Sequence, residues 1–403
     1  MNDLARILAL WRNLEPAGAD YVLATVVGVQ GPSYRKRGAL MLLTGDGRRV
    51  GTVSGGCLEA EVSSRAWWLT ANGPTIQRYS TADDDGERPY GSGCGGVVFL
   101  LLERRTTADP LLAALEQAFQ RRVPLAVATA LEGPHLARRG FAGLEPGSSQ
   151  AVQSPVLQPL VIQPQFIQPQ ATPIGSDPLK DLAEQSLASR ESMESEVATG
   201  QASARAWADY RPARPCLGIF GAGDDARPLM RLAKELGWFV SVADGRSHLA
   251  TRERFPSADA LSVLPIKDLP GLPFDESLAP FERLQPDDAA VVMTHSFEQD
   301  SKVLACLLSH PTPPAYIGVL GPQRRTRELL GEAAQLLNLP ASAVAAQAER
   351  WLDQVYAPTG LDLGAESPET IALSILAEIQ KFRASATALP LRKVRAAQVT
   401  IAG

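Results

Sequence analysis

The turn formed by Gly221, Ala222 and Gly223 has the residue types and spacing of a nucleotide-binding loop. It follows the apolar run Cys216 to Phe220 and precedes a helical pattern over residues 225–236. At such a junction the amides and dipole of the first helical turn attract phosphate, and glycine lets the backbone approach it closely. This turn is therefore a candidate site for the pyrophosphate of a dinucleotide.

Asp244 ends the next predicted strand, about 20 residues after the turn, where an acid can bind a ribose hydroxyl and favour NAD over NADP. Ala226 takes the place of the third glycine of the usual fingerprint. Arg246 offers the alternative of accommodating a 2′-phosphate, and two carboxylates, Asp224 and Asp225, would repel a pyrophosphate if they faced it. The other interpretation of the turn is that it only closes a strand–helix unit and binds nothing.

Cys57 and Cys94 lie in two glycine-rich segments of the first part of the chain, GTVSGGCLEAEV and GSGCGG. Cys57 stands at a predicted helix start, where the helix dipole stabilises a thiolate. Cys94 precedes an apolar strand in a loop whose glycines expose backbone amides to a ligand. Both are candidate ligand contacts, and the alternative is that each serves as a small hydrophobic side chain.

His295 is the remaining residue of chemical interest. It follows a predicted strand in VVMTHSFEQD, at the sheet edge where open α/β folds place ligands. A proton donor and a hydrogen-bonding cap of the strand are both compatible with this position. The sequence assigns no catalytic residue and no metal site, since the four cysteines are widely separated and form no CxxC pair.

The elements that position Cys57 and Cys94 form a mixed α/β pattern, which we assign to a first domain over residues 1–142. Runs with strand and helix periodicity alternate along it. The predicted strands cover 21–29, 39–43, 49–53, 75–79, 97–103 and 124–130, and the predicted helices cover 4–14, 58–69 and 110–120.

Residues 143–214 are rich in Gln, Pro and Ser and repeat fragments such as LQP and IQP between Val156 and Gln170. Prolines remove backbone donors and favour extended chain, so this composition indicates a linker or surface excursion. Its Val, Leu, Ile and Phe residues leave a second possibility, in which part of it packs as an extended strand along one domain.

The elements around Gly221 and His295 alternate as strand and helix, and we assign them to a domain over 215–385, followed by a tail over 386–403. Such alternation predicts a Rossmann-like, doubly wound and mostly parallel sheet. The expected strands cover 216–220, 239–243, 289–293 and 315–319, and the expected helices cover 225–236, 299–308, 323–337 and 368–383.

Composition narrows the class of protein. The 403 residues contain 45% hydrophobic and 21% charged side chains, as in ordinary globular proteins. A net charge of −5 argues against a nucleic-acid partner, which normally requires a basic surface. We find neither an apolar stretch of spanning length nor a signal-peptide pattern, so we expect no membrane association and a cytoplasmic location.

Taken together, these segments resemble the xanthine dehydrogenase accessory protein family (XdhC/CoxI). The resemblance rests on three segments of the first domain and five of the second, which occur in the family's order. They are GPSYRKRGALML, GTVSGGCLEAEV and GSGCGG, then IFGAGDDARPL, VADGR, VVMTHSFEQD, YIGVLGPQRR and APTGLDLGAESPETIALSILAEI.

This resemblance implies a maturation chaperone that binds molybdenum cofactor (molybdopterin), assists its sulfuration with a cysteine desulfurase and delivers it to an apo-molybdenum hydroxylase. It makes Cys57 and Cys94 contacts of molybdenum or sulfur, and leaves Gly221, Gly223 and Asp244 as an NAD(P) site. A homodimer is expected by analogy with the family alone. The residues themselves leave open an NAD-dependent oxidoreductase, with His295 as proton donor, or a regulator that responds to NAD.

Overall fold

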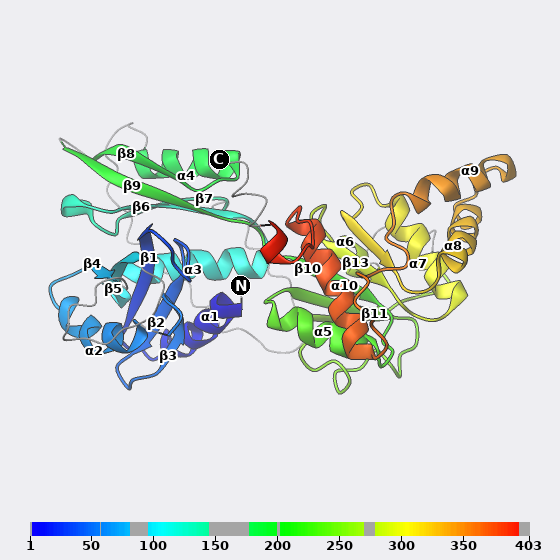
Figure 1. The fold of residues 1–403 in the computed structure, drawn as a ribbon, viewed down its shortest axis with the longest axis horizontal. Helices are drawn as coiled ribbons and strands as arrows, with labels where there is room; N and C mark the ends of the chain where they lie inside the picture. Colours follow the sequence, from blue (N-terminus) through cyan, green and yellow to red (C-terminus); the bar gives the residue numbers. More distant parts are fainter. Residues whose placement is uncertain are drawn as a thin grey trace. The chain divides into compact units, whose positions relative to one another are not determined.

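The computed structural model describes residues 2–56, 58–80, 96–144, 177–199, 202–269 and 279–394. The chain divides into two compact units, one over 3–213 and the other over 214–403 together with the first two residues. The helices and strands of both units are labelled in Figure 1.

The first half of the first unit is a five-stranded antiparallel sheet in the order β3-β2-β1-β5-β4. Three helices accompany it, one before the first strand, one between β3 and β4, and one after β5. The strands are β1 (Tyr21–Gln30), β2 (Leu40–Thr44), β3 (Arg49–Gly51), β4 (Thr75–Ser80) and β5 (Val97–Arg104), and the helices are α1 (Asn2–Leu14), α2 (Glu59–Leu69) and α3 (Arg105–Arg121).

Strand β1 is buried on both faces, which explains its unbroken apolar sequence. Successive side chains of a strand point to opposite faces. Tyr21 and Leu23 accordingly pack with residues of α1 and α3, whereas Val22, Ala24 and Val26 pack with residues of α2. The sheet is thus covered by helices on both sides.

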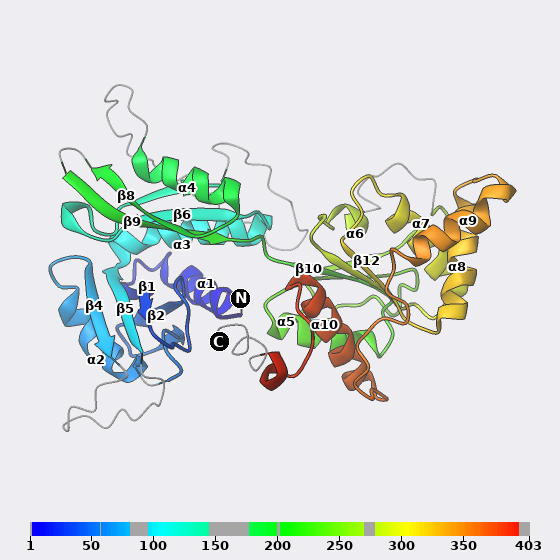
Figure 2. The same ribbon diagram turned by 45° about the horizontal axis from the view of Figure 1, so that its top comes forward.

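The second half of the unit is a four-stranded antiparallel sheet in the order β7-β6-β9-β8, and helix α4 lies along it (Figure 2). A single 3-10 turn, η1, connects the two strands that come first in the chain. The elements are β6 (Leu125–Ala130), η1 (Gly133–His135), β7 (Arg139–Ala142), α4 (Pro178–Ser189), β8 (Met193–Thr199) and β9 (Ala202–Arg211).

Residues 178–199 and 202–211 therefore differ from the linker expected over 143–214. The Asp177 side chain caps α4 by accepting from the Leu179 amide, and Pro178 occupies the first helical turn. Strand β9 turns Ala204, Ala206 and Ala208 inward, and β6 pairs with it. These local signals follow the Gln/Pro-rich repeats, whose composition dominated the sequence interpretation; the repeats themselves lie outside the described residues.

The second unit is built on a five-stranded, wholly parallel sheet in the order β12-β11-β10-β13-β14. This confirms the predicted Rossmann-like fold. The strands are β10 (Cys216–Phe220), β11 (Phe239–Asp244), β12 (Ala260–Val263), β13 (Ala289–Val292) and β14 (Tyr316–Val319), and the helices are α5 (Ala226–Glu235), α6 (Ala279–Glu282), α7 (Phe297–Ser309), α8 (Gln323–Leu336), α9 (Ala341–Leu352) and α10 (Pro368–Arg383).

Two helical layers cover this sheet (Figure 1). Residues of α5 and α10, including Leu229 and Ile375, pack in one core with Leu217 and Val240 of the sheet. Residues of α6, α7, α8 and α9 pack in a second core with Phe220 and other sheet residues. Strand order reverses between β10 and β13, so the loops that follow these strands form the crevice where such folds bind ligands.

Three elements of this unit were not expected from the sequence: β12, α6 and α9. Strand β12 spans only four residues, ALSV, and three of them are partly or fully exposed to solvent. Such an edge strand lacks the apolar run that reveals a central one.

Among the described residues, no helix combines the length and apolar character needed to cross a membrane.

Candidate functional site

Three sequence motifs of the first unit meet at the loop that follows β1. A Cβ added to Gly96, just before β5, would lie 2.0 Å from the Pro32 carbonyl oxygen. A Cβ added to Gly55, between β3 and α2, would lie 3.4 Å from the Tyr34 ring. The segments that carry Cys57 and Cys94 thus both approach residues 32–34, although the two cysteines themselves lie outside the described residues.

A buried carboxylate organises the segment before α2. Glu59 is 1% exposed, and its Oε1 accepts hydrogen bonds from the amides of Val53 and Ser54 at 3.1 and 2.9 Å. Its Oε2 accepts from the Ser54 hydroxyl at 2.6 Å, and that hydroxyl oxygen in turn accepts from the amides of Gly56 and Leu58. Glu59 and Ser54 therefore fix the backbone on both sides of Cys57.

These hydrogen bonds determine the ionisation of Glu59. Burial by itself raises the pKa of this carboxyl, but the hydroxyl of Ser54 and the amides of Ser54 and Val53 favour the charged form and leave the pKa below its ordinary value. The segment is thus held by a carboxylate, and its integrity depends on that carboxylate being charged.

Two basic residues of the loop after β1 have structural partners. Arg35 donates from Nε to the Thr52 hydroxyl at 2.6 Å and pairs with Asp3. Arg37 donates from Nε to the Val27 carbonyl and lies over the Trp207 ring at 4.7 Å. The exposed side chains in this loop include Tyr34, which is 73% exposed.

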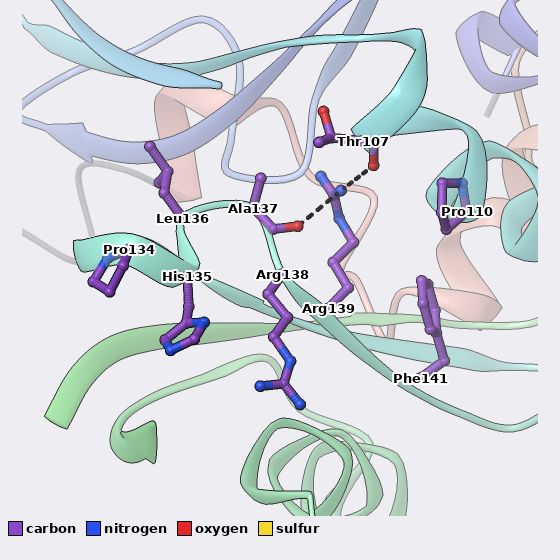
Figure 3. A pocket seen from close by; sticks show the side chains of 9 residues that line it. All are labelled: Thr107, Pro110, Pro134, His135, Leu136, Ala137, Arg138, Arg139 and Phe141. Carbon is purple, nitrogen blue, oxygen red and sulfur yellow. Dashed lines mark hydrogen bonds between the residues drawn. The ribbon is translucent and has the colours of Figure 1, made fainter. Parts of the chain in front are cut away.

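A pocket of about 370 Å³ lies elsewhere in this unit, between the start of α3, η1 and β7 (Figure 3). Arg139 is in its wall, with a side chain only 4% exposed that pairs with the fully buried Glu103. The same guanidinium donates to the carbonyls of Thr107 and Ala137. This pair joins β5 to β7, so it has a structural role, and none of the predicted site residues lines the pocket.

In the second unit the turn after β10 packs closely against the protein itself at Gly221. Gly221 has φ +133°, and a Cβ there would lie 2.4 Å from the Met293 carbonyl oxygen. A Cβ on Gly223 would lie 2.6 Å from Asp225 Oδ1. Close approach to the backbone just after β13 therefore explains Gly221 without any bound ligand, whereas the atom nearest Gly223 is the end of a side chain, which can move.

Asp244 is fully buried and bonds within the protein. Its Oδ2 accepts from the Ala222 amide at 2.7 Å and from Arg246 Nη2 at 2.8 Å. Its Oδ1 accepts from the amide and Nε of Arg246 at 2.8 and 2.9 Å. Burial raises the pKa of Asp244, but these bonds outweigh it and lower the pKa. In this structure Asp244 holds the glycine turn to β11.

His295 and Asp225 meet across the crevice between β10 and β13. His295 Nε2 lies 2.7 Å from Asp225 Oδ2, although 70 residues separate them in the chain. The imidazole is 62% exposed and the carboxylate 15%. The sequence predicted His295 at this edge but did not identify Asp225 as its partner.

A second buried acid, Asp300, fixes the residue before His295. Asp300 Oδ1 accepts from the amide and hydroxyl of Thr294 at 3.1 and 2.6 Å, and Oδ2 accepts from Arg325 Nη2 at 2.7 Å. Asp300 was not singled out from the sequence, because an acid in the first turn of a helix is common for electrostatic reasons alone. Arg325 belongs to the basic run 323–327, which the sequence left as either a phosphate contact or a solvated face, and the structure pairs it with Asp300 instead.

Within the described ranges, no group of three or more His, Cys, Asp or Glu side chains is placed to hold a metal ion. The arrangement offers two sites of different chemistry: a glycine-rich loop cluster at one end of the first sheet, and a histidine–carboxylate pair at the switch point of the Rossmann sheet. The chain is therefore a two-unit α/β protein, in which a mixed α/β unit precedes a Rossmann unit and each unit carries one candidate site.

Comparison with known proteins gives the family. Residues 217–379 match the XdhC Rossmann domain, and residues 14–80 match the XdhC and CoxI family. A Bacillus subtilis protein, named as a probable subunit of xanthine dehydrogenase, is 30% identical over 373 residues, covering 90% of this chain and 93% of the relative. The chain belongs to the XdhC and CoxI family.

Two further relatives are informative. The Escherichia coli protein named molybdenum cofactor insertion chaperone PaoD is 36% identical over 115 residues, 26% of this chain and 33% of that protein. The crystal structure of a Bacillus halodurans protein described as a xanthine dehydrogenase aligns with a TM-score of 0.65 at 26% identity, over 97% of this chain and 98% of that one.

Proposed function

We propose that this protein is an accessory factor that binds molybdenum cofactor, assists its sulfuration and delivers it to a molybdenum hydroxylase of the xanthine dehydrogenase type. The names of the relatives from Bacillus subtilis and Escherichia coli support this role. The observation that carries it is the approach of two cysteine-bearing, glycine-rich segments to a single loop, residues 32–34.

Cys57 and Cys94 are the proposed contacts of the cargo. Soft thiolates suit molybdenum and persulfide sulfur, and the amides of glycine-rich loops suit the phosphate of the pterin. Ser54 and Glu59 hold the residues on either side of Cys57 by hydrogen bonds. The proposed partners are a cysteine desulfurase, as the sulfur donor, and an apo-hydroxylase, as the acceptor.

The test is retention of molybdenum and pterin by the purified protein, measured by metal analysis and pterin fluorescence. We expect stoichiometric retention in the wild type and loss in Cys57→Ala and Cys94→Ala without unfolding. Cys306→Ala is the matched control, because burial raises the pKa of this thiol to about 12 and makes it unreactive. Unchanged retention in the Cys57/Cys94 double variant would remove both from the site.

We propose that the Rossmann unit binds NAD(P) at the turn of Gly221 and Gly223, with Asp244 supporting it. The first turn of α5 lies at the switch point and receives no side-chain cap from Asp225, which favours a pyrophosphate there. Because Asp244 bonds to Arg246 and to the Ala222 amide, its ribose contact requires a rearrangement of these bonds. Calorimetry with NAD and NADP measures both binding and preference.

An NAD-dependent oxidoreductase is the second candidate, favoured by the position of His295 at the same edge. A dehydrogenase needs a proton donor or acceptor next to the nicotinamide. Nucleotide reduction that depends on a substrate, in protein that retains no molybdenum, would replace the accessory role with this one.

Light scattering, with and without nucleotide, tests the homodimer proposed by analogy with the family.

A further inference from the structure

His295 has a backbone conformation that side chains rarely adopt. Its φ is +61°, in the left-handed region, where a residue other than glycine costs about 1–2 kcal/mol. Histidine enters this region more often than most residues, and residues in such conformations concentrate at functional sites when the surrounding structure holds them there.

Both neighbours of His295 are fixed. Thr294 is fully buried, and its amide and hydroxyl donate to Asp300. Ser296 donates from its amide to the Thr294 hydroxyl oxygen and caps α7 by accepting from the Gln299 amide. The strand end and the helix start thus impose the conformation, which directs the imidazole toward the turn after β10.

The Asp225 carboxylate bonds to His295 and does not cap its own helix. It occupies the N-cap position of α5, where an aspartate normally accepts from an amide of the first turn, but it makes no such bond. Its Oδ2 is bonded to His295, and its buried Oδ1 has no partner among the described residues. The helix forgoes its cap, and the carboxylate orients the imidazole instead.

The other carboxylates at this edge are paired with arginines. Asp244 is bonded to Arg246, Asp300 to Arg325, and the exposed Asp224 to Arg254 and Arg227. Among these four acids, Asp225 is the one that meets the histidine. The imidazole Nδ1, by contrast, has no hydrogen-bond partner within the part of the chain that the structure describes.

We propose that His295 and Asp225 form a proton-transfer dyad that acts on a hydroxyl or thiol of a ligand bound at the switch point of the Rossmann sheet. Asp225 accepts a hydrogen bond from the Nε2–H group, which keeps that proton on Nε2 and leaves the Nδ1 lone pair free. Nδ1 takes the proton of the ligand, a new N–H bond replaces the O–H or S–H bond, and the bonding electrons stay on the oxygen or sulfur. Asp225 stabilises the imidazolium that results.

The first test is the tautomer of His295, read from ring nitrogen shifts in two-bond ¹H–¹⁵N spectra at a pH where ordinary imidazoles are neutral. The chain has four histidines, so the signal is assigned by its loss in His295→Gln. We expect the Nε2–H form in the wild type and a tautomer mixture in Asp225→Ala. Asp224→Ala removes the neighbouring, 80% exposed carboxylate and should leave the signal unchanged.

The second test is the reactivity of Nδ1 toward diethyl pyrocarbonate, followed at each histidine by mass spectrometry. In the wild type Asp225 occupies Nε2, so we expect one carbethoxyl group on His295; Asp225→Ala frees Nε2 and should allow a second, whereas Asp224→Ala should react like the wild type. The nucleotide used as probe, NADPH or NAD, should protect His295 and leave His310 reactive.

This inference rests on the proposed placement of a ligand at the Rossmann edge, and the two tests separate its failure from that of the proposed function. An Nδ1–H tautomer in the wild type, or unchanged reactivity in Asp225→Ala, overturns the dyad whatever the protein binds. Calorimetric binding of a nucleotide that leaves His295 unprotected overturns its contact with the ligand. Absence of nucleotide binding rejects the proposed NAD(P) site, and the dyad is then decided by its tautomer and reactivity.

Discussion

The hydroxyl of Ser54 donates a 2.6 Å hydrogen bond to Glu59 Oε2, and both side chains are buried at the start of α2. Through this contact the first residue of a helix organises the loop that precedes it. Because the loop includes the residues on either side of Cys57, the stability of the proposed cargo site depends on a carboxylate that does not itself touch the cargo.

We expect Glu59→Gln to lower the free energy of unfolding by about 1–3 kcal/mol. The amide nitrogen of glutamine cannot accept a hydrogen bond, so a buried donor that is paired with Glu59 in the wild type would lose its acceptor. Urea denaturation measures the loss. Glu61→Gln is the matched control on the same helix, where Glu61 pairs with Arg65 four residues on. That surface pair contributes about 0.3–0.5 kcal/mol. Equal effects of the two substitutions would contradict the role of Glu59.

The same carboxylate predicts an acid-dependent difference. The folded pKa of Glu59 lies below its ordinary value of 4.5, so its stabilising contribution is complete above that pH and is lost as the pH falls through the folded pKa. The difference in unfolding free energy between wild type and Glu59→Gln should therefore narrow below pH 4.5. A difference that stays constant or widens in urea titrations over this range would show that Glu59 is not held as a carboxylate.

Asp244→Asn should destabilise the Rossmann unit by about 2 kcal/mol even without nucleotide. It leaves the Arg246 guanidinium without its carboxylate, at a cost reduced because that side chain is 34% exposed to water. Thermal unfolding of the unliganded protein measures the effect. Asp224→Asn, at an 80% exposed position, is the control and should change stability by less than about 0.5 kcal/mol. Unchanged thermal stability of Asp244→Asn would contradict the structural role of Asp244 and leave ligand binding as its remaining role.

The same substitution, glycine to alanine, should change the free energy of unfolding in opposite directions at two positions. Gly221→Ala places a Cβ 2.4 Å from the Met293 carbonyl at φ +133° and should cost about 2–4 kcal/mol. Gly331→Ala, inside α8 with no atom within 4 Å of the added Cβ, should stabilise by about 0.5–1 kcal/mol. Chemical denaturation of both variants compares them directly, and a tolerated Gly221→Ala would show that the turn relaxes away from β13.

Some of the site was accessible to sequence reasoning and some was not. The position of His295 after a strand predicted its place at the sheet edge, because all strands of a parallel sheet end at that edge. Its contact with Asp225 was not predictable, since 70 residues separate the two and an aspartate at a helix start normally caps the helix. Likewise the pattern predicted Asp244 at a strand end, but not that its four hydrogen bonds would be satisfied within the protein.

The sequence by itself determined the local units: the alternation of strands and helices after residue 215, the glycine turn and the two cysteine-bearing loops. These features follow from periodicity and backbone freedom, which act over a few residues. Tertiary structure alone decided that β9 pairs with β6, that the loops around Gly55 and Gly96 meet at residues 32–34, and that His295 meets Asp225. Such contacts join residues far apart in the chain, and their partners are selected by packing and chain topology, which no local pattern encodes.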